Sequence, residues 1–233
     1  MASTRQSENL LLAALPSADF DLLRPNLRTV DLPLGMTIMK AGEIPARAYF
    51  PHSGVVASTM ILNSGRVVEV RITGREGALG VITGTARHPS FTSSVVRIQG
   101  TASAIDQVSL KTVVDSSAAF RTALAKQVAV QQAMADQSVA CHAEHDLEAR
   151  LARRLLRLYT MSGQLKFTAT QEVLAEMLGV KRNAVSLVAH AMQEAHVIRY
   201  SRGLVEIVDV DRLHQLSCEC YDSVTEYRNA LAT

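Results

Sequence analysis

Hydrophobic and polar positions follow a short β-type pattern over the first half of the chain. Between Leu27 and about Leu110, runs rich in β-branched residues are separated by Gly, Pro, Asn and Ser at short, regular intervals. Such spacing is typical of an all-β sandwich or barrel, and it predicts eight or so strands packed as a jelly roll. Asn63-Ser64-Gly65 is the clearest hairpin turn in this region. Residues 78–83, ALGVIT, are expected to form one of the strands.

Two short helices are expected to precede this roll. The segment from Ser7 to Leu15, SENLLLAAL, is expected to form a short helix that ends before Pro16, with Ser7 as its candidate N-cap. A further helical turn or two is expected around residues 18–24. Their expected role is to cover one end of the roll.

From Ser116 to about Met161 the pattern becomes helical, and Gly and Pro are absent. A helix of this length, at about 1.5 Å per residue, is too long for one small core. We expect it to pair with its own copy as a two-stranded coiled coil, and the alternative is packing on its own β-domain alone. The pattern changes near His145-Asp146, which is a candidate hinge. The expected seam contains Phe120, Leu124, Val128, Gln131, Met134, Ser138, Cys141 and His145.

The stretch from Thr170 to Met192 predicts two helices joined by a tight turn at Gly179. Thr170 can cap the first helix with its hydroxyl, and glycine can adopt the positive φ that a sharp turn requires. On the second helix, four apolar residues share one face at helical spacing, namely Val185, Val188, Ala189 and Met192. The small residue, the turn glycine and the apolar residues each have a separate steric role. This combination favours a helix-turn-helix over a helical hairpin that only packs against a core.

The opposite face of the second helix is mostly polar and has cations at its N-terminal end. A helix of this kind can enter the DNA major groove and contact base edges. The expected base-facing residues are Lys181, Arg182, Asn183, Ser186, Leu187 and His190. Thr170 and Gln171 are expected to contact phosphate.

Two β-branched runs follow, from Val197 to Tyr200 and from Leu204 to Val208, around Ser201-Arg202-Gly203. They predict a hairpin with Arg199 and Arg202 at its tip, and a helix-turn-helix followed by a basic hairpin is a winged helix. One final amphipathic helix with an acidic bias is expected after it.

The net charge of the whole chain indicates little about its partners, but the net charges of its segments differ. The formal net charge is +2. Residues 147–203 contain nine Lys or Arg and four Glu, a local net charge of +5, whereas residues 204–233 carry a net charge of −4. A basic stretch at the predicted DNA-binding domain suits phosphate contact. The alternative is a solvated helical face at residues 150–157.

The three cysteines do not indicate a disulfide framework, because their number is odd and no secretion signal precedes them. Cys141 and His145 lie four residues apart on the expected seam, so two copies would bring together a Cys₂His₂ set that zinc accepts. A polar hinge is the favoured interpretation of that pair. Cys218-Glu219-Cys220 is expected on an exposed helix face. The sequence therefore assigns no metal site.

The sequence resembles the Crp-Fnr family of bacterial transcription regulators over nearly its full length. The matching segments are LLAALP, KAGEIPARAYFPHSG, GRVVEVRITGREGALG, DLEARLARRLLRL, TQEVLAEMLGVKRNAVS and HVIRYSRGLVEIVDVDRL. The resemblance implies an α+β chain with a cyclic-nucleotide-binding-like β-roll over residues 1–115, a dimerisation helix over 116–146 and a winged helix-turn-helix over 147–233. It also implies a homodimer on double-stranded DNA with a palindromic operator, in contact with RNA polymerase. No run is long and apolar enough to span a membrane and no secretion signal is found, so a cytoplasmic protein without a membrane partner is expected.

The departures from the family concern the sensor. Members that bind cyclic AMP hold the cyclic phosphate with an Arg-Ser-Ala segment, but residues 88–94 here contain no arginine, and Ala135-Asp136 replaces the Thr-Ser pair that meets adenine. Cyclic AMP is therefore not expected. An Fnr-type iron–sulfur cluster is not expected either, since no cysteine precedes Cys141. The candidate effector residues are Arg75, Glu76, Gly77, Thr92, Ser93 and Arg97.

No motif for catalysis is found: the chain lacks a nucleophile elbow, a zinc-protease helix and a phosphate-binding Gly loop. We therefore expect a regulator and not an enzyme, controlled by an unidentified N-terminal signal. Two alternatives remain for the roll. It is either vacant and purely structural, or it senses a nucleotide or dinucleotide in an atypical pocket.

Overall fold

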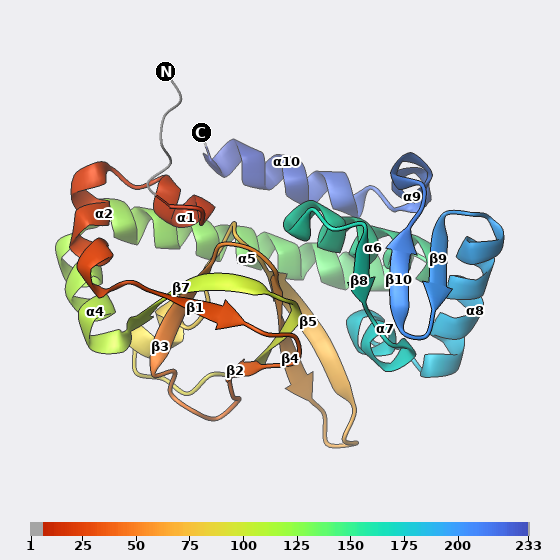
Figure 1. Cartoon of the computed structure of the whole chain (residues 1–233), viewed down its shortest axis with the longest axis horizontal. Helices are drawn as coiled ribbons and strands as arrows, with labels where there is room; N and C mark the ends of the chain where they lie inside the picture. Colours follow the sequence, from red (N-terminus) through yellow and green to blue (C-terminus); the bar gives the residue numbers. More distant parts are fainter. Residues whose placement is uncertain (1–6, 233) are drawn as a thin grey trace. The chain divides into compact units, whose positions relative to one another are not determined.

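The computed structural model describes residues 7–232, which divide into two compact units. The first unit is formed by the residues up to 60 together with 71–128. The second is formed by residues 61–70 and those from 129 onwards. Both combine helices with antiparallel sheets, so the predicted α+β class is confirmed (Figure 1).

The strands between residues 28 and 106, a range described throughout, form two antiparallel sheets. The first has the order β1-β7-β3 and the second has the order β2-β6-β4-β5. Gly65, with φ +78°, closes the predicted hairpin turn between β4 and β5. The strands are β1 (Arg28–Leu32), β2 (Thr37–Met39), β3 (Arg47–Pro51), β4 (Val55–Ile61), β5 (Val67–Thr73), β6 (Ser93–Ile98) and β7 (Gly100–Asp106).

The alternating pattern of the sequence places one apolar face of each sheet against the other. Leu32 of β1 and Ala102 of β7 pack with Val56 of β4 and Val96 of β6 in one buried cluster. A second cluster lies between the first sheet and the surrounding helices, and Phe50 and Phe120 are its largest members, each fully buried. Burial of these side chains is what holds the roll together.

Two of the sequence predictions for the helices of this unit are wrong. The first helix, α1 (Leu10–Ala13), is capped by Asn9 and not by Ser7: the buried Asn9 amide accepts from the Leu12 N–H at 3.1 Å. Its NH₂ group donates to the carbonyl oxygens of Pro51 and Gly77. Residues 81–85, expected as a strand, form helix α3 (Val81–Thr85). The remaining helices are α2 (Ser17–Leu23), η1 (Arg24–Asn26) and α4 (Gln107–Ser116).

The long helical region is divided where the sequence pattern changed. Helix α5 (Ala118–Glu144) ends before His145, and α6 (Leu147–Ser162) begins after Asp146. The Asp146 carboxylate accepts from the Ala149 N–H at 2.8 Å and caps α6. Gly163, in the left-handed region at φ +70°, ends α6.

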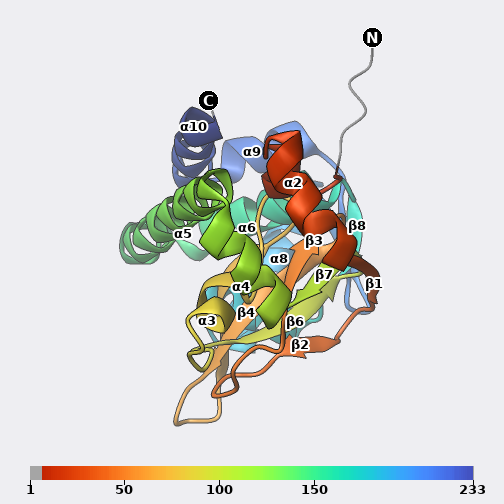
Figure 2. The same ribbon diagram turned by 90° about the vertical axis from the view of Figure 1, so that its left-hand side faces the viewer.

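The second unit is built around α6, which packs against α7 (Gln171–Leu178), α8 (Arg182–Glu194), α9 (Val210–Leu216) and α10 (Cys220–Ala232). A three-stranded sheet of order β8-β10-β9 completes it (Figure 1), with β8 (Lys166–Thr168), β9 (Ile198–Ser201) and β10 (Leu204–Ile207). Figure 2, turned by 90°, shows α2 and α4 in front of the strands of the first unit. The single C-terminal helix predicted from the sequence is wrong, because the chain breaks between α9 and α10 at residues 217–219. Among the described residues, no helix combines the length and apolarity that crossing a membrane requires.

The buried Phe120 side chain provides a test of the first core. We expect Phe120→Ala to lower the free energy of unfolding by about 3–5 kcal/mol, because it leaves a cavity in a cluster that cannot fully collapse. Urea denaturation followed by far-ultraviolet circular dichroism measures this loss. Val108→Ala on α4, where the side chain is 81% exposed, is the matched control and should change stability by no more than about 0.5 kcal/mol.

Candidate nucleic-acid interface

The turn between α7 and α8 has the geometry that the sequence predicts. The Thr170 hydroxyl accepts from the Val173 N–H at 3.2 Å and caps α7. Gly179 adopts φ +65°, and the Val180 N–H returns to the Ala175 carbonyl at 3.1 Å. A left-handed residue at this point turns the chain within three residues, so that α8 crosses α7 at close range.

Helix α8 buries one face and exposes the other. Val185, Ala189 and Met192 are at most 2% exposed, and Val188 is half-buried. Because these residues repeat at helical spacing, their burial fixes the rotation of the helix about its axis. The face predicted to contact bases is consequently directed away from the core.

The predicted base-facing residues lie on this outer face. Lys181, Arg182, Asn183 and His190 are exposed, and Leu187 is 74% exposed. Ser186 is partly buried, and its hydroxyl donates to the Arg182 carbonyl at 3.2 Å. An exposed Leu flanked by cations and amides suits a groove that offers both phosphates and thymine methyl groups.

Arg182 is held against the start of α7. Its Nη1 lies 2.8 Å from the Glu172 carboxylate, and its Nε donates to the Gln171 side-chain oxygen at 2.6 Å. The ion pair is exposed on both sides, so water and salt screen it and a phosphate or base edge can compete for the guanidinium. These contacts keep Arg182, which is predicted to contact a base, next to Gln171, which is predicted to contact phosphate.

The wing differs from the prediction in one respect. Arg202 and Gly203 form its tip with φ values of +50° and +76°, as a two-residue hairpin of the primed type requires. Arg199, predicted at the tip, lies within β9 instead. There it faces Glu206 of β10, and its Nη1 lies 2.8 Å from that carboxylate. The register between β9 and β10 determines which residues lie at the tip. The sequence pattern could not define the ends of the two strands to within one residue.

The arginines of α6 do not form a DNA-facing or solvated surface, which corrects the interpretation of the local charge. Arg150 donates to the Leu178 carbonyl, and Arg154 donates to the Met177 carbonyl at 3.3 Å. Burial lowers the pKa of both guanidinium groups. Cations at the C-terminal carbonyls of a helix stabilise it, so these two residues hold the end of α7 in place. Sequence reasoning missed this role, because their partners are backbone atoms.

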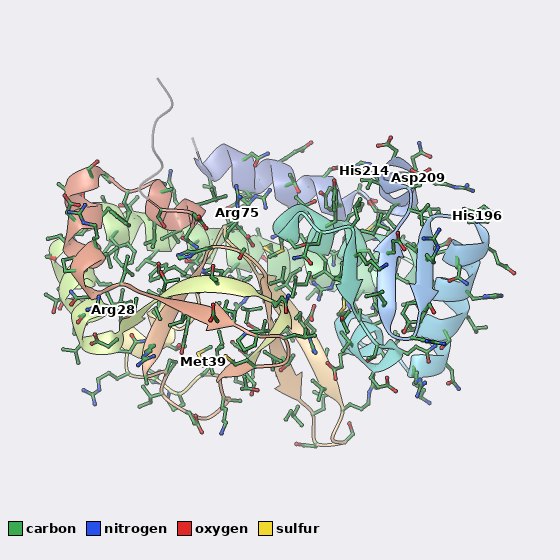
Figure 3. The ribbon with its side chains drawn as sticks, in the orientation of Figure 1. Arg28, Met39, Arg75, His196, Asp209 and His214 are labelled. Carbon is green, nitrogen blue, oxygen red and sulfur yellow. The ribbon has the colours of Figure 1, made fainter. Side chains whose placement is uncertain are left out.

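The candidate effector residues are not gathered at one place in the first unit. The segment 75–77 follows β5, whereas Thr92 and Ser93 lie at the start of β6, where Ser93 accepts from the Ala41 N–H at 3.0 Å. Met39 pairs with Ser94, and Figure 3 shows Met39 and Arg75 at opposite ends of the roll. Arg97 is half-buried within β6. The effector assignment remains a prediction from the sequence.

Three residues of the predicted dimer seam are buried within their own chain. Phe120 and Leu124 belong to the core of the first unit at 0% and 5% exposure, and Cys141 is fully buried in the second. The remaining seam residues of the second unit, Gln131, Met134, Ser138 and His145, are only partly exposed. A side chain already covered by its own chain adds little to an interface with another copy. The pairing of two copies along α5 remains a prediction.

The expectation for the other cysteines is also wrong. Cys218 and Cys220, predicted on an exposed helix face, are 6% and 1% exposed. Burial and the neighbouring thiol raise the pKa of Cys218 to about 12, and burial raises the pKa of Cys141. The Cys218 thiol therefore lacks the thiolate character of a reactive cysteine at neutral pH.

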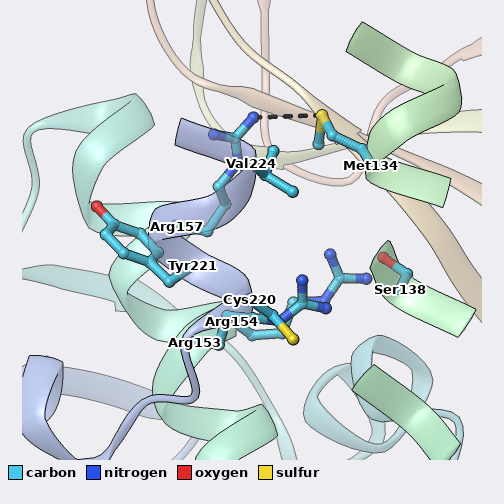
Figure 4. Close-up of a pocket in the computed structure, with 8 residues that line it drawn as sticks. All are labelled: Met134, Ser138, Arg153, Arg154, Arg157, Cys220, Tyr221 and Val224. Carbon is cyan, nitrogen blue, oxygen red and sulfur yellow. Dashed lines mark hydrogen bonds between the residues drawn. The ribbon is translucent and has the colours of Figure 1, made fainter. Parts of the chain in front are cut away.

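A pocket of about 30 Å³ lies beside these cysteines in the second unit, between α5, α6 and α10 (Figure 4). Its lining is Met134, Ser138, Arg153, Arg154, Arg157, Cys220, Tyr221 and Val224. A cavity of this volume holds roughly two water molecules. It is far too small for a nucleotide.

Comparison with known proteins identifies the second unit most directly. Residues 149–216 match the model of the Crp-like helix-turn-helix domain. None of the curated proteins matches the chain significantly.

Solved structures share the fold of most of the chain. A Crp/Fnr-family transcriptional regulator from Thermus thermophilus is 20% identical, with 82% of this chain and 98% of that one covered and a TM-score of 0.68. FixK2 from Bradyrhizobium japonicum is 15% identical, with 82% and 98% covered and a TM-score of 0.69. The c-di-GMP-responsive global regulator CLP of Xanthomonas campestris is 14% identical, with 83% and 100% covered and a TM-score of 0.68.

These likenesses show that both units have the architecture of Crp/Fnr regulators, and the domain match places the helix-turn-helix on the residues described above. The chain therefore contains a Crp-like helix-turn-helix domain at residues 149–216, and its fold is that of solved Crp/Fnr-family regulators.

Proposed function

We propose that the protein binds a two-fold symmetric operator as a homodimer, with α8 of each copy in the major groove. The exposed polar face of α8, whose N-terminal end carries Lys181 and Arg182, is the observation that supports this most. Helix-turn-helix dimers place two such helices one turn of duplex apart, so the operator repeats its half-site in inverted order.

Each exposed residue of α8 suits a different contact. Arg182 can donate two hydrogen bonds to guanine, Asn183 pairs best with adenine, and Leu187 offers an apolar contact to a thymine methyl group. Gln171 and the Thr170 hydroxyl are the proposed phosphate contacts at the start of α7, and Arg202 at the wing tip is the proposed contact to the flanking backbone. Arg199 is the second proposed contact to the flanking backbone, and phosphate would have to displace its ion pair with Glu206 as it would that of Arg182 with Glu172.

We propose that the dimer forms through a face of α5 rotated by one residue from the predicted seam. This face repeats at three- and four-residue spacing and is exposed throughout, and its members are Ala125, Val128, Gln132, Ala135, Val139 and His142. Val139 is 73% exposed and Val128 is 45% exposed, which is unusual for Val in the middle of a helix. A second copy of α5 would cover both in a two-stranded coiled coil.

The signal that controls the protein remains a proposal of two alternatives. CLP of Xanthomonas campestris responds to c-di-GMP, so a cyclic dinucleotide is one ligand class for the roll of this chain. Arg75 is exposed and Arg97 half-buried in the first unit, and both are cations that such a phosphate would need. The other alternative is a roll that binds no small molecule. Contact with RNA polymerase is proposed from the resemblance alone.

Arg182→Ala tests the base-reading role of α8. We expect a loss of about 1–3 kcal/mol in specific binding and a relaxed preference at the guanine position, because the neutral side chain cannot contact that base. Gel-shift titration on an operator selected by the natural protein from random duplexes measures this. Arg24→Ala, which removes an exposed arginine from the first unit, is the control and should bind like the natural protein. Unchanged affinity of Arg182→Ala would show that α8 docks differently.

Val139→Glu tests the dimer face. We expect self-association to weaken by at least about tenfold, because the coiled coil would have to bury an unpaired carboxylate from each copy. Sedimentation velocity across a concentration series measures the dissociation constant. Val70→Glu is the control, since Val70 is 40% exposed but lies on β5. If both variants dimerise as tightly as the natural protein, the interface lies elsewhere.

A thermal-shift screen separates the two alternatives for the roll. If the pocket is functional, one class among cyclic mononucleotides and cyclic dinucleotides should raise the melting temperature in proportion to the logarithm of ligand concentration. At a free ligand concentration of about 100 times Kd the stabilisation is about 2.7 kcal/mol. A flat response to every compound at millimolar concentration supports the vacant roll.

A further inference from the structure

The second unit brings its three cysteines and one histidine to a single point. Cys141 lies near the end of α5, His145 follows in the turn before α6, and Cys218 and Cys220 lie at the junction of α9 and α10. One ligand atom from each residue lies within 4.8 Å of the ligand atoms of the other three. The thiols are buried and unoxidised, and the imidazole is partly buried.

The separations between these atoms match those around a tetrahedral ion. The Sγ atoms of Cys141 and Cys218 are 3.6 Å apart, and the Cys220 Sγ lies 3.6 Å from the His145 Nδ1. With Zn–S near 2.3 Å and Zn–N near 2.0–2.1 Å, a tetrahedron separates its ligand atoms by about 3.5–3.8 Å. Two of the distances already have these values, so small movements of the other pairs suffice to complete the shell.

We propose that these four residues bind one zinc ion per chain in a closed Cys₃His site. Three sulfurs and one nitrogen in tetrahedral order are the ligand set that structural zinc prefers. All four ligands come from the same chain, so the site is distinct from the intermolecular Cys₂His₂ set that the sequence suggests. An iron–sulfur cluster with several irons is larger than a single ion, so its cysteine sulfurs would have to lie farther apart.

Neighbouring side chains already have the arrangement of a zinc site's outer shell. The His145 Nε2 lies 3.2 Å from the Glu219 carboxylate, and the Nδ1 lies 3.6 Å from the Cys220 Sγ. A neutral ring that donates its Nε2–H to Glu219 offers the Nδ1 lone pair to a metal ion. A histidine that donates its second ring N–H to a carboxylate is the usual partner of zinc, since this fixes the tautomer and the ring orientation. The Gln137 amide donates to the Cys220 sulfur at 3.0 Å, as a donor to a thiolate would.

The local charge also suits an anionic zinc–thiolate centre at this point. Three thiolates and one Zn²⁺ carry a net charge of −1, and the guanidinium groups of Arg150 and Arg153 lie close enough to interact electrostatically with Cys141. Figure 4 shows Arg153 beside Cys220, and the Arg153 Nε is buried without a hydrogen-bond partner in this structure. Buried cations are normally paired, and an anionic zinc–thiolate centre would supply the counter-charge.

Such an ion would join three segments that are distant in sequence. It would tie the start of α10 to the end of α5 at the break that precedes α6, the helix on which α7 and α8 pack. The free energy of zinc binding then contributes to the folding of the second unit, because the unfolded chain has no preformed site. The zinc is therefore structural and its presence does not depend on DNA.

Metal analysis of the full-length protein tests the proposal. The chain is expressed without a histidine tag, purified under reducing conditions and dialysed against a weak chelator before elemental analysis by mass spectrometry. We expect close to one zinc per chain. Replacement by Co²⁺ should give thiolate charge-transfer bands in the near ultraviolet and the intense visible bands of a tetrahedral site.

Matched variants locate the ion. Cys218→Ser and Cys141→Ser should lose the zinc and the cobalt spectrum, whereas His142→Ala, which removes an exposed neighbouring imidazole, should keep both. Glu219→Gln should keep the stoichiometry but weaken zinc affinity by about 10–100-fold in competition with a chromogenic chelator, because the imidazole loses its carboxylate partner. This variant keeps all four ligands, so it remains informative if a serine variant fails to fold.

Three results would overturn the proposal. The first is reduced natural protein that holds neither zinc nor the cobalt spectrum after exposure to each metal. The second is zinc that is retained at full stoichiometry by both serine variants, which would place it elsewhere. The third is iron in place of zinc in the purified protein. A Cys141–Cys218 disulfide, found by mass spectrometry after purification with zinc but without reductant, would have the same meaning. None of these results bears on DNA binding, which the gel-shift titrations test separately.

Discussion

The fixed position of α7 on α6 is the constraint on which the rest of the second unit depends. Arg150 and Arg154 hold the last carbonyl groups of α7, and Gly179 then turns the chain into α8. Once α7 is fixed in this way, the buried residues of α8 admit only one rotation of that helix. The direction of its polar face therefore follows from hydrogen bonds made at the end of α7.

Helix α5 has different partners on its two sides. One side carries Leu124 into the core of the first unit and Cys141 into that of the second. Another side is left exposed and carries Val128 and Val139 at the spacing of a coiled coil. Since apolar and small residues occur on both sides, the helix lacks a single dominant apolar stripe, and its pattern alone assigns neither side to a partner.

The junction between α5 and α6 both starts a helix and contributes a residue to the proposed zinc site. Asp146 starts α6, and the adjacent His145 faces Cys220 from the far end of the chain. The backbone at a break between two helices ordinarily has more conformational freedom than the helices themselves. Here it is surrounded by buried thiols and by arginines that need a counter-charge, so the proposed ion would make this break the most rigid point of the unit.

The sequence by itself determined the order of the elements, the helix-turn-helix, the wing and the residues exposed on α8, because these depend on local spacing, caps and turn residues such as Thr170 and Gly179. It did not determine what the arginines of α6 contact or which face of α5 is exposed. It also did not bring the Cys218-Glu219-Cys220 segment to Cys141, which lies 77 residues earlier. Contacts of that range arise only when α9 and α10 pack on α6, and neither periodicity nor spacing along the chain encodes them. The tertiary structure therefore decided the site that the sequence left unassigned.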